Sequence, residues 1–478
     1  MFFNSIEFAI FFPVVFLLYW LVFKNNVRLR NLFIILVSYF FYGMWDWRFL
    51  SLIVISSLAD FVIGAKLQNE ENDARRKLLL VSSIVLNIGI LGFFKYFNFF
   101  ADSFINVFTL FGAEFTYNRL NIILPVGISF YTFQTLSYTL DIYKGKLNAT
   151  KDVLSFFAFV SFFPQLVAGP IERAKDLLPQ FFTAKKVNYE DIRSGLVTIA
   201  IGLFKKIVIA DRLAIFVDSA FDDIPGASGA PILIASIFFA FQLYLDFSAY
   251  SDIAIGVART LGFKLSTNFR RPYLSISFSG FWSRWHISLS SWFRDYVYIP
   301  LGGNRGTKMK TILNIMIVFV LSGLWHGASW NFVIWGLMNG LFLILLDEYL
   351  LKIIHIKIVK SFIVILGWVL SLIFFRAETF SDSILAYSEL GFSNFEKLYE
   401  FGLNGIEFKL AIWLLVGTIL MELVSEKLAK NELNISDWLM LRPIIVRYSF
   451  YIVIIGSVLF FGSYGVGLND QSFIYFQF

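Results

Sequence analysis

Two of the chain's three histidines, His286 and His326, lie in the stretch Leu243–Asn339, and each follows a tryptophan. His326 comes at the end of the apolar run Ile312–Leu324, at a depth where an ionisable side chain is costly in lipid. Burial favours the neutral imidazole, which can accept a proton from a hydroxyl. The pair therefore allows general-base catalysis of acyl transfer to an alcohol. The alternative is a histidine that is hydrogen-bonded between packed helices.

A basic segment surrounds the first of these histidines. Lys264–Lys310 holds eight bases and one acid, Asp295, a local charge of +7 against +6 for the whole chain. A cytoplasmic loop that obeys the positive-inside rule would also be basic. Tryptophans and tyrosines alternate with the bases, so we expect the segment to fold back into the protein or to lie at the membrane interface, which would make a basic, aromatic-lined cytoplasmic cavity. Such a cavity suits a donor that carries phosphates, such as acyl-CoA (acetyl-CoA), near Arg270 and Arg271.

The composition decides which class of protein must position these residues. Of 478 residues, 58% are hydrophobic and 19% aromatic, and the mean hydropathy is +0.71. Such a chain cannot cover itself with polar surface, and its apolar runs are continuous rather than alternating. We therefore predict an all-α, polytopic integral membrane protein, a single domain over residues 1–478, with roughly 11–13 membrane helices including short or re-entrant ones.

Basic residues set the expected orientation. Lys24, Arg28 and Arg30 follow the first span, and Arg75–Lys77 follow the third. By the positive-inside rule both loops are cytoplasmic and the N-terminus lies outside. Pro170–Arg193 and Lys264–Lys310 are two later basic loops, and both would lie outside if every earlier apolar run crossed the membrane once. We therefore expect that an early run is re-entrant or that Leu124–Tyr143 makes an extra crossing. This charge pattern indicates sorting across a membrane and no nucleic-acid binding.

Several kinds of chemistry have no signature here. The chain has no cysteine, no HExxH, no dinucleotide or P-loop glycine motif and no GxSxG. We therefore expect no metal site and no bound cofactor. His355 lies among lysines at an expected helix end, which indicates a structural residue at the water boundary. A transporter of an anionic substrate is the alternative class, but the chain lacks the two similar halves that many carriers have.

Long motifs give the chain a family resemblance. They are LPVGISFYTFQTLSYTLDIYKG, FFPQLVAGPIERA, LYLDFSAYSDIAIGVARTLGF, FWSRWHISLSSWFRDYVYIPLGGNR and LSGLWHGASWNFVIWG. In these motifs the chain resembles the membrane-bound O-acyltransferase (MBOAT) family. The likeness is strongest to its bacterial branch of alginate and peptidoglycan O-acetylation membrane subunits, and it covers nearly the whole chain.

The resemblance implies the MBOAT fold and roles for single residues. His326 in LWHG matches the family's near-invariant histidine, and His286 matches its second one. Both would lie along a path that takes an acyl group from a cytoplasmic donor toward the outer face. The resemblance also implies a multi-pass protein of the bacterial inner membrane, an extracytoplasmic SGNH-type acetyltransferase partner and a polysaccharide acceptor.

Other residues are candidates to line that path. Asp246 and Asp252 end an apolar span, and buried polar groups in lipid need partners, so we expect them to bond to the core or to the path. For each of the other candidates, packing between helices is an equal alternative. These are Trp285, Arg284, Asp295, Tyr296, Trp325 and Asn331.

Overall fold

The computed structural model describes residues 1–112, 117–430, 435–462 and 473–474. These residues form helices, and within those ranges the one extended pairing is an isolated bridge between Gly229 and Leu390. The predicted all-α class is thereby confirmed. The chain divides into two compact units, residues 1–192 with 257–266, and residues 193–256 with 267–478. The single domain predicted for residues 1–478 stays a prediction.

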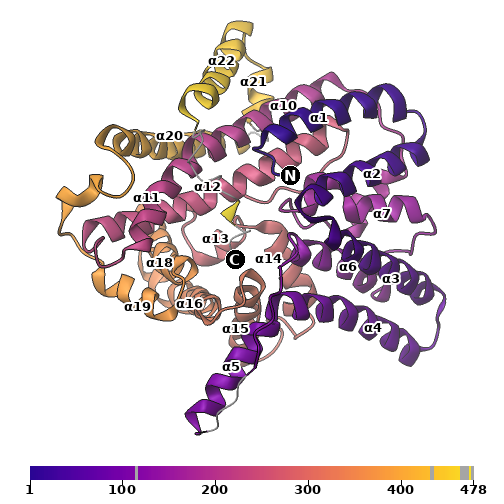
Figure 1. Ribbon diagram of the computed structural model, residues 1–478, viewed down its shortest axis with the longest axis horizontal. Helices are drawn as coiled ribbons and strands as arrows, with labels where there is room; N and C mark the ends of the chain where they lie inside the picture. Colours follow the sequence, from indigo (N-terminus) through magenta and orange to yellow (C-terminus); the bar gives the residue numbers. More distant parts are fainter. Residues whose placement is uncertain (113–116, 431–434, 463–472, 475–478) are drawn as a thin grey trace. The chain divides into compact units, whose positions relative to one another are not determined.

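Most of the helices are long and apolar. Nine stretches of the described chain could cross a membrane by length and composition, so the protein is a multi-pass membrane protein. Two stretches hold more than one helix, residues 27–69 with α2 and α3, and residues 73–110 with α4 and α5. Figure 1 labels the elements. The helices of the first unit are α1 (Ile6–Leu18), α2 (Val27–Asp46), α3 (Leu50–Asn69), α4 (Asp73–Leu91), α5 (Phe97–Leu110), α6 (Ile128–Tyr143), α7 (Val153–Ser161), α8 (Phe163–Leu166) and α9 (Ala174–Leu177).

The remaining helices belong wholly or mainly to the second unit. A π-helical turn, η5 (Phe204–Ala210), joins its first two helices, and another, η8 (Leu346–Leu350), continues the α16 helix. The helices are α10 (Tyr189–Leu203), α11 (Asp211–Asp222), α12 (Ala230–Thr260), α13 (Phe278–Trp282), α14 (Ile287–Phe293), α15 (Lys308–His326), α16 (Trp330–Leu345), α17 (Leu351–Ile353), α18 (Lys357–Arg376), α19 (Phe380–Glu389), α20 (Gly405–Ala429), α21 (Ile435–Met440) and α22 (Ile444–Phe461).

Helices α3, α4 and α6 of the first unit pack around a buried carboxylate. Asp60 accepts hydrogen bonds from Ser83 (2.6 Å) and Asn87 (2.8 Å), and Thr135 of α6 donates to the Asn87 side chain (3.2 Å). Such pairing is what the absence of water in a bilayer demands of buried polar groups. Nearly every residue of α6 is buried, so the stretch Leu124–Tyr143, where an extra crossing was one of two expectations, contains a core helix.

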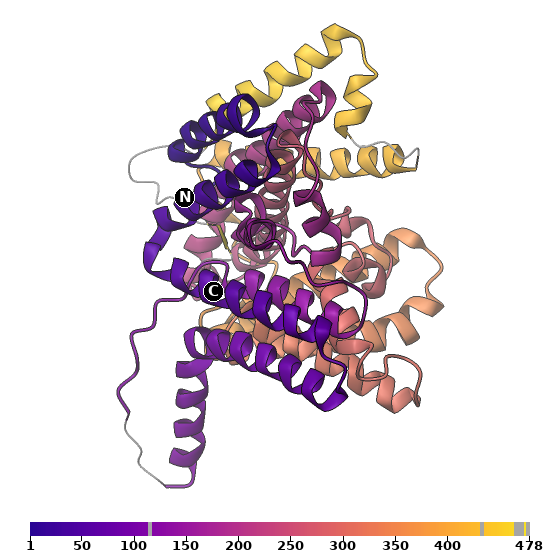
Figure 2. The same cartoon turned by 90° about the vertical axis from the view of Figure 1, so that its right-hand side faces the viewer.

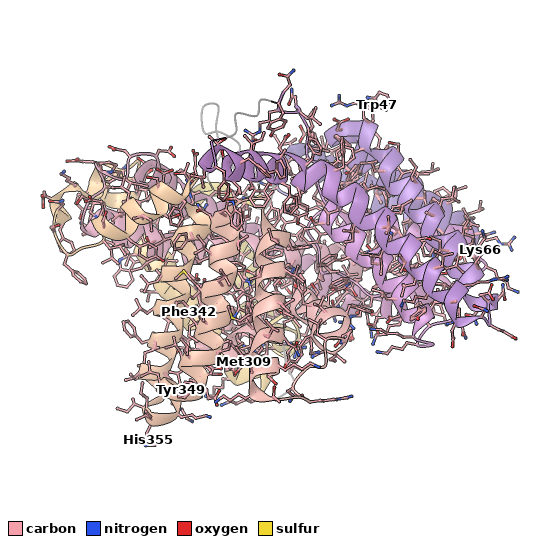
Figure 3. All side chains as sticks on the ribbon, turned by 90° about the horizontal axis from the view of Figure 1, so that it is seen from below. Trp47, Lys66, Met309, Phe342, Tyr349 and His355 are labelled. Atoms are coloured by element: carbon pink, nitrogen blue, oxygen red, sulfur yellow. The ribbon has the colours of Figure 1, made fainter. Side chains whose placement is uncertain are left out.

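Helices α15 and α16 of the second unit form a tight hairpin. A methyl group on Gly323 would lie 2.1 Å from the Phe332 carbonyl oxygen, and one on Gly336 would lie 2.3 Å from the Phe319 carbonyl oxygen. Small residues therefore let the two backbones touch, as is usual between membrane helices. Figure 3 shows Met309 and Tyr349 at one end of the hairpin, with His355 beyond them. His326, the last residue of α15, is at the other end, about 28 Å away along the helix.

We expect Gly336→Ala to destabilise the protein by about 1–3 kcal/mol, because the added methyl group meets backbone rather than a flexible side chain. The measurement is the thermal unfolding midpoint of the purified protein in detergent. Gly417→Ala on α20 is the matched control, since nothing lies within 4 Å of the new methyl group. Equal midpoints for the two variants would contradict close backbone packing of the hairpin.

Candidate active site

The two histidines of the tryptophan–histidine pairs lie side by side. His326 ends α15 and His286 precedes α14, and their ring centroids are 6.5 Å apart. Both are buried, with 4% of His326 and 1% of His286 exposed. The fold thus brings together the two residues that the sequence analysis placed first, although forty positions separate them in the chain.

The backbone at His286 is strained. Its φ of 41° and ψ of 55° lie in the left-handed region, which is uncommon for a residue other than glycine. Hydrogen bonds on both sides hold this conformation, because Trp285 N–H donates to Phe281 (2.9 Å) and Ser290 N–H donates to the His286 carbonyl (2.9 Å). Conformations of this kind cost about 1–3 kcal/mol and cluster at functional sites.

Burial also sets the charge of His286. Removal from water lowers the pKa of its imidazole to about 3, so the ring is neutral at pH 7. A neutral imidazole carries one donor and one acceptor nitrogen. His286 can therefore hold a polar group of a substrate by a hydrogen bond without adding a charge to the site.

Aromatic side chains enclose His326. Trp325 and Trp335 lie edge-on to its ring, both with centroids 5.0 Å away, and Phe375 of α18 lies at 5.4 Å. Trp325 is also 5.7 Å from His286, so it joins the two rings. Only 4% of His326 is exposed, so these side chains shield its ring from the surroundings of the protein. The sequence analysis included Trp325 but missed Trp335 and Phe375, which come from other helices.

A short helix leads into His286 and contacts the enclosure of His326. Helix α13 carries Trp282, whose indole lies 5.9 Å from Trp335, and it leads directly into Trp285 and His286. The Asp347 carboxylate on η8 accepts the N–H groups of Phe278 (2.7 Å) and Ser279 (2.8 Å) at the start of this helix. Asp347 is the acid that follows His326 soonest in the sequence, and the fold uses it to anchor α13.

Trp285 packs within the aromatic core. Its ring lies 4.8 Å from Trp368 and 5.6 Å from Phe281, and it is 1% exposed. Asn331 is buried too, and its side chain donates to the Ala377 carbonyl (2.9 Å), which ties α16 to the end of α18. These contacts pack both residues between helices, and the path role predicted for them stays a prediction.

Asp295 and Tyr296 lie on the turn that follows α14. Asp295 pairs with Arg294 (2.8 Å), and Tyr296 packs on Trp292 with centroids 5.1 Å apart. Both side chains are half-buried. The path role predicted for them stays a prediction.

A buried ion cluster ties η5, α11 and α12 together. Lys206 pairs with Asp211 (2.8 Å) and with Asp246 (2.9 Å), and at most 8% of each side chain is exposed. Asp246 also accepts the backbone N–H of Ile474 (2.9 Å). Asp252, one and a half turns further along α12, pairs with Lys205 (2.7 Å). Both aspartates thus have charged partners. The sequence signal that could have indicated the cluster is Lys206, a charged residue within an apolar run.

One ring connects the end of the chain to the histidine pair. Phe473 stacks on Tyr250 with centroids 4.3 Å apart and lies 5.6 Å from Phe247. Phe247 in turn lies edge-on to His286, at 4.6 Å. Residues near the C-terminus therefore help to cover the buried site, which nothing in the sequence pattern indicated.

In the basic segment Lys264–Lys310, several aromatic side chains are buried and several basic side chains are exposed. Trp285, Trp292 and Phe293 are buried, whereas Arg270, Arg305 and Lys308 are exposed. The segment therefore folds back into the protein instead of forming a solvated loop, and the basic cavity expected there stays a prediction.

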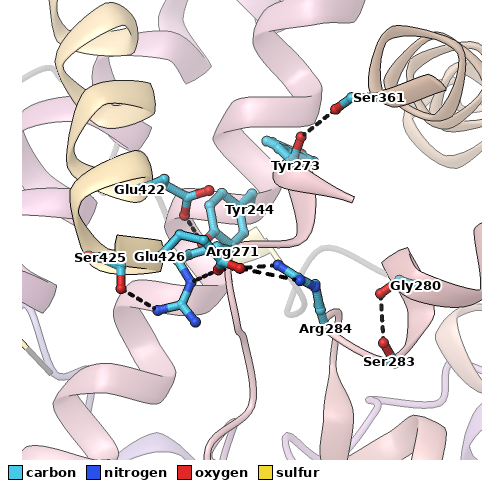
Figure 4. Close-up of polar contacts among 10 residues, drawn as sticks. All are labelled: Tyr244, Arg271, Tyr273, Gly280, Ser283, Arg284, Ser361, Glu422, Ser425 and Glu426. Atoms are coloured by element: carbon cyan, nitrogen blue, oxygen red, sulfur yellow. Dashed lines mark hydrogen bonds and ion pairs between the residues drawn. The ribbon is translucent and has the colours of Figure 1, made fainter. Parts of the chain in front are cut away.

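The fold distinguishes the two arginines that were predicted to bind the donor. Arg271 pairs with Glu426 on α20 (2.6 Å), and Arg284 reaches the same carboxylate (3.3 Å), as Figure 4 shows. Arg271 also donates to the Ser425 carbonyl (3.0 Å). Arg270 is exposed, and its backbone N–H donates to Arg284 (2.9 Å). Arg271 is therefore held by α20, and Arg270 is the base that faces solvent.

Metal ligands do not gather in the described chain. Across residues 1–112, 117–430, 435–462 and 473–474 there is no group of three or more His, Cys, Asp or Glu side chains that could hold a metal ion.

Comparison with known proteins places this site among acyl-transferring relatives. Residues 147–381, which include both histidines, match the model of the membrane-bound O-acyltransferase family. The chain is 39% identical over 396 residues to the probable alginate O-acetylase AlgI of Azotobacter vinelandii, covering 81% of this chain and 77% of that protein. It is 36% identical over 411 residues to the peptidoglycan O-acetyltransferase of Helicobacter pylori, covering 78% and 76%. A teichoic acid D-alanyltransferase of Bacillus subtilis is 31% identical over 233 residues, covering 46% and 58%.

We expect Lys206→Ala to lower the thermal unfolding midpoint strongly, because breaking a buried ion pair leaves uncompensated charge and costs about 3–5 kcal/mol. Lys308→Ala, which removes a pair with Glu348 whose side chains are 60% and 38% exposed, is the control and should change little. The triple variant Lys206→Met, Asp211→Asn, Asp246→Asn should recover part of the loss. Equal effects of the two single substitutions would contradict the cluster's structural role.

Proposed function

The chain belongs to the membrane-bound O-acyltransferase family, and from that premise we propose that it moves an acyl group, acetyl in the simplest case, from a cytoplasmic acyl-CoA donor across the membrane to a hydroxyl of a cell-surface polysaccharide. That the protein is a membrane acyltransferase follows from its relatives. The donor, the direction and the roles of single residues are the proposal. The observation that carries it is the juxtaposition of His286 and His326, 6.5 Å apart inside an aromatic enclosure.

His326 is the proposed general base. As the acceptor hydroxyl attacks the carbonyl carbon of the thioester, its proton passes to the neutral imidazole and the new C–O bond forms. The C–S bond then breaks, and the thiolate leaves with the proton that the imidazole returns. The products are an ester and a free thiol, and the histidine is regenerated. A base of this kind contributes roughly 10²–10⁴-fold to the rate.

His286 is proposed to act on the donor side. It lies within the basic segment, in which Arg270 faces solvent, and its ring is neutral, so it can hydrogen-bond to the thioester without competing for the proton. The aromatic rings between the two histidines exclude water. In such a site the thioester meets the acceptor hydroxyl rather than a hydrolytic water.

Relatives support a glycan or polyol acceptor. Their names speak of alginate, peptidoglycan and teichoic acid, which are all polymers of the cell envelope. We infer that the acyl group is passed to such a polymer with the help of an extracytoplasmic SGNH-type partner, and that the membrane is the bacterial inner membrane. Basic residues at the Met309 end of α15, opposite His326, support a cytoplasmic donor side.

We expect His326→Ala to abolish acyl transfer, with a loss of at least about 100-fold, while the protein still inserts and keeps its unfolding midpoint. The assay follows labelled acetyl-CoA with the purified protein and an acceptor polysaccharide. His355→Ala is the matched control, because this third histidine is exposed in the turn before α18. If the wild-type protein and His326→Ala both export substrate and neither transfers an acyl group, the enzyme proposal is overturned in favour of a transporter.

We expect Arg270→Glu to raise the KM for acetyl-CoA several-fold and to leave kcat unchanged, because a solvent-facing base attracts the donor's phosphates but does not touch the reacting atoms. Added salt should shrink the difference. Lys357→Glu, which changes another exposed base at the start of α18, is the control. Arg271→Glu should instead destabilise the fold by opposing Glu426, and Glu426→Arg in the same chain should restore it. An unchanged KM in Arg270→Glu would remove this residue from the donor site.

A further inference from the structure

Helix α5 of the first unit follows α4 without a loop, but the two cannot both cross the membrane. A π-helical turn, η3 (Gly92–Tyr96), joins them into a stretch of 38 residues. At 1.5 Å per residue a straight helix of this length would measure about 57 Å, against a hydrocarbon core of about 30 Å. Figure 2 shows the chain turning at this joint, so that α5 leaves the direction of α4. In Figure 3, α5 lies on the side of the unit that carries Trp47 rather than Lys66.

One face of α5 is apolar and exposed. Phe100, Phe104, Val107 and, just after the helix, Phe111 are 58%, 57%, 50% and 82% exposed. Their spacing of three to four residues places them in one stripe along the helix. No residue of α5 is buried. A helix of 14 residues gains little stability from its backbone alone, so the environment of this stripe must contribute.

The opposite face of α5 is polar and is bound by the chain that follows. Asn98 exchanges two hydrogen bonds with the backbone of Leu120 (2.8 and 3.2 Å). Asp102 accepts a hydrogen bond from the Tyr117 hydroxyl and pairs with Arg119 (3.7 Å). At 100° per residue, Asn98 and Asp102 point about 180° away from the phenylalanine stripe. Residues within 117–120 therefore bind the polar face of α5 and leave its phenylalanine stripe exposed.

We propose that α5 is an interfacial helix whose phenylalanine stripe lies in the boundary between lipid headgroups and acyl chains, on the side of the bilayer opposite Lys66 and the basic residues Arg75–Lys77. An amphipathic helix of this kind buries its apolar face about 5–10 Å into that boundary. The occupant is a lipid surface rather than a protein, because the membrane-spanning α4 ends where α5 begins and so delivers the stripe to the edge of the bilayer. Helix α5 then fixes the depth of the first unit in the membrane.

The chain offers a direct test because it contains no cysteine. Phe104→Cys and Val107→Cys place a single environment-sensitive fluorophore on the stripe, and Asn106→Cys and Thr109→Cys place it on the exposed polar side as matched controls. The full-length variants are reconstituted in vesicles of phosphatidylethanolamine and phosphatidylglycerol. Labels on the stripe should emit at shorter wavelength and be quenched several-fold more by nitroxide-bearing lipids, whereas labels on the polar side should be quenched by aqueous iodide.

Two outcomes would overturn the proposal. Equal access of iodide to all four labels would show that the stripe faces water. Shielding of positions 104 and 107 that requires an added extracytoplasmic protein, and is lost in pure lipid vesicles, would show a protein-docking face instead. Two stripe positions guard against a variant that fails to fold, which size-exclusion chromatography before reconstitution detects. The readout needs no acyl transfer, so it is independent of the proposed function.

Discussion

Lys206 can remain charged inside the helix bundle only because two carboxylates neutralise it, and the buried site is built on that arrangement. Asp211 and Asp246 lie 2.8 and 2.9 Å from its ammonium group. Without partners a charge in such a setting would cost several kcal/mol. The cluster fixes α12 against η5 and α11, and through Asp246 it also holds Ile474. Phe247, the next residue along α12, then lies against His286.

Close backbone packing supplies the other half of the site. The glycines of α15 and α16 let the hairpin close, so His326 meets Trp335 of the second helix, while α13 brings His286 in from the other side. The left-handed backbone of His286 shows that the ring is placed against a local conformational preference. Such strain persists only where the surroundings over-determine the conformation, as the Asp347 anchor and the tryptophan packing do here.

Charge outside the site is arranged so that the fold and the proposed function use different residues. Glu426 binds Arg271 and Arg284, whereas Arg270 remains at the surface. The glutamate itself lies in the last turn of α20, a candidate span, where an unpaired acid would be costly. The two paired arginines therefore support α20, and Arg270 is the exposed base to which the proposal assigns the donor. A basic segment alone does not reveal this division, because all its arginines look alike in sequence.

The sequence by itself determined that this is a multi-pass helical membrane protein, it singled out two histidines as candidates for the chemistry, and its long motifs indicated the family. Those features are local, since hydropathy, glycine placement and the tryptophan–histidine pairs are all read within a few residues. The tertiary structure alone decided that the two histidine rings lie 6.5 Å apart, that Trp335, Phe375 and Phe247 surround them, and that Lys206 lies between Asp211 and Asp246. It also decided that Asp347 anchors α13 and that Phe473 covers the site. Each of these contacts joins residues from separate helices, and an apolar helix can turn any face toward a neighbour at similar cost in hydrophobic burial. Packing of particular side chains and the need to pair buried charges select one of those faces. Neither can be read from the linear sequence.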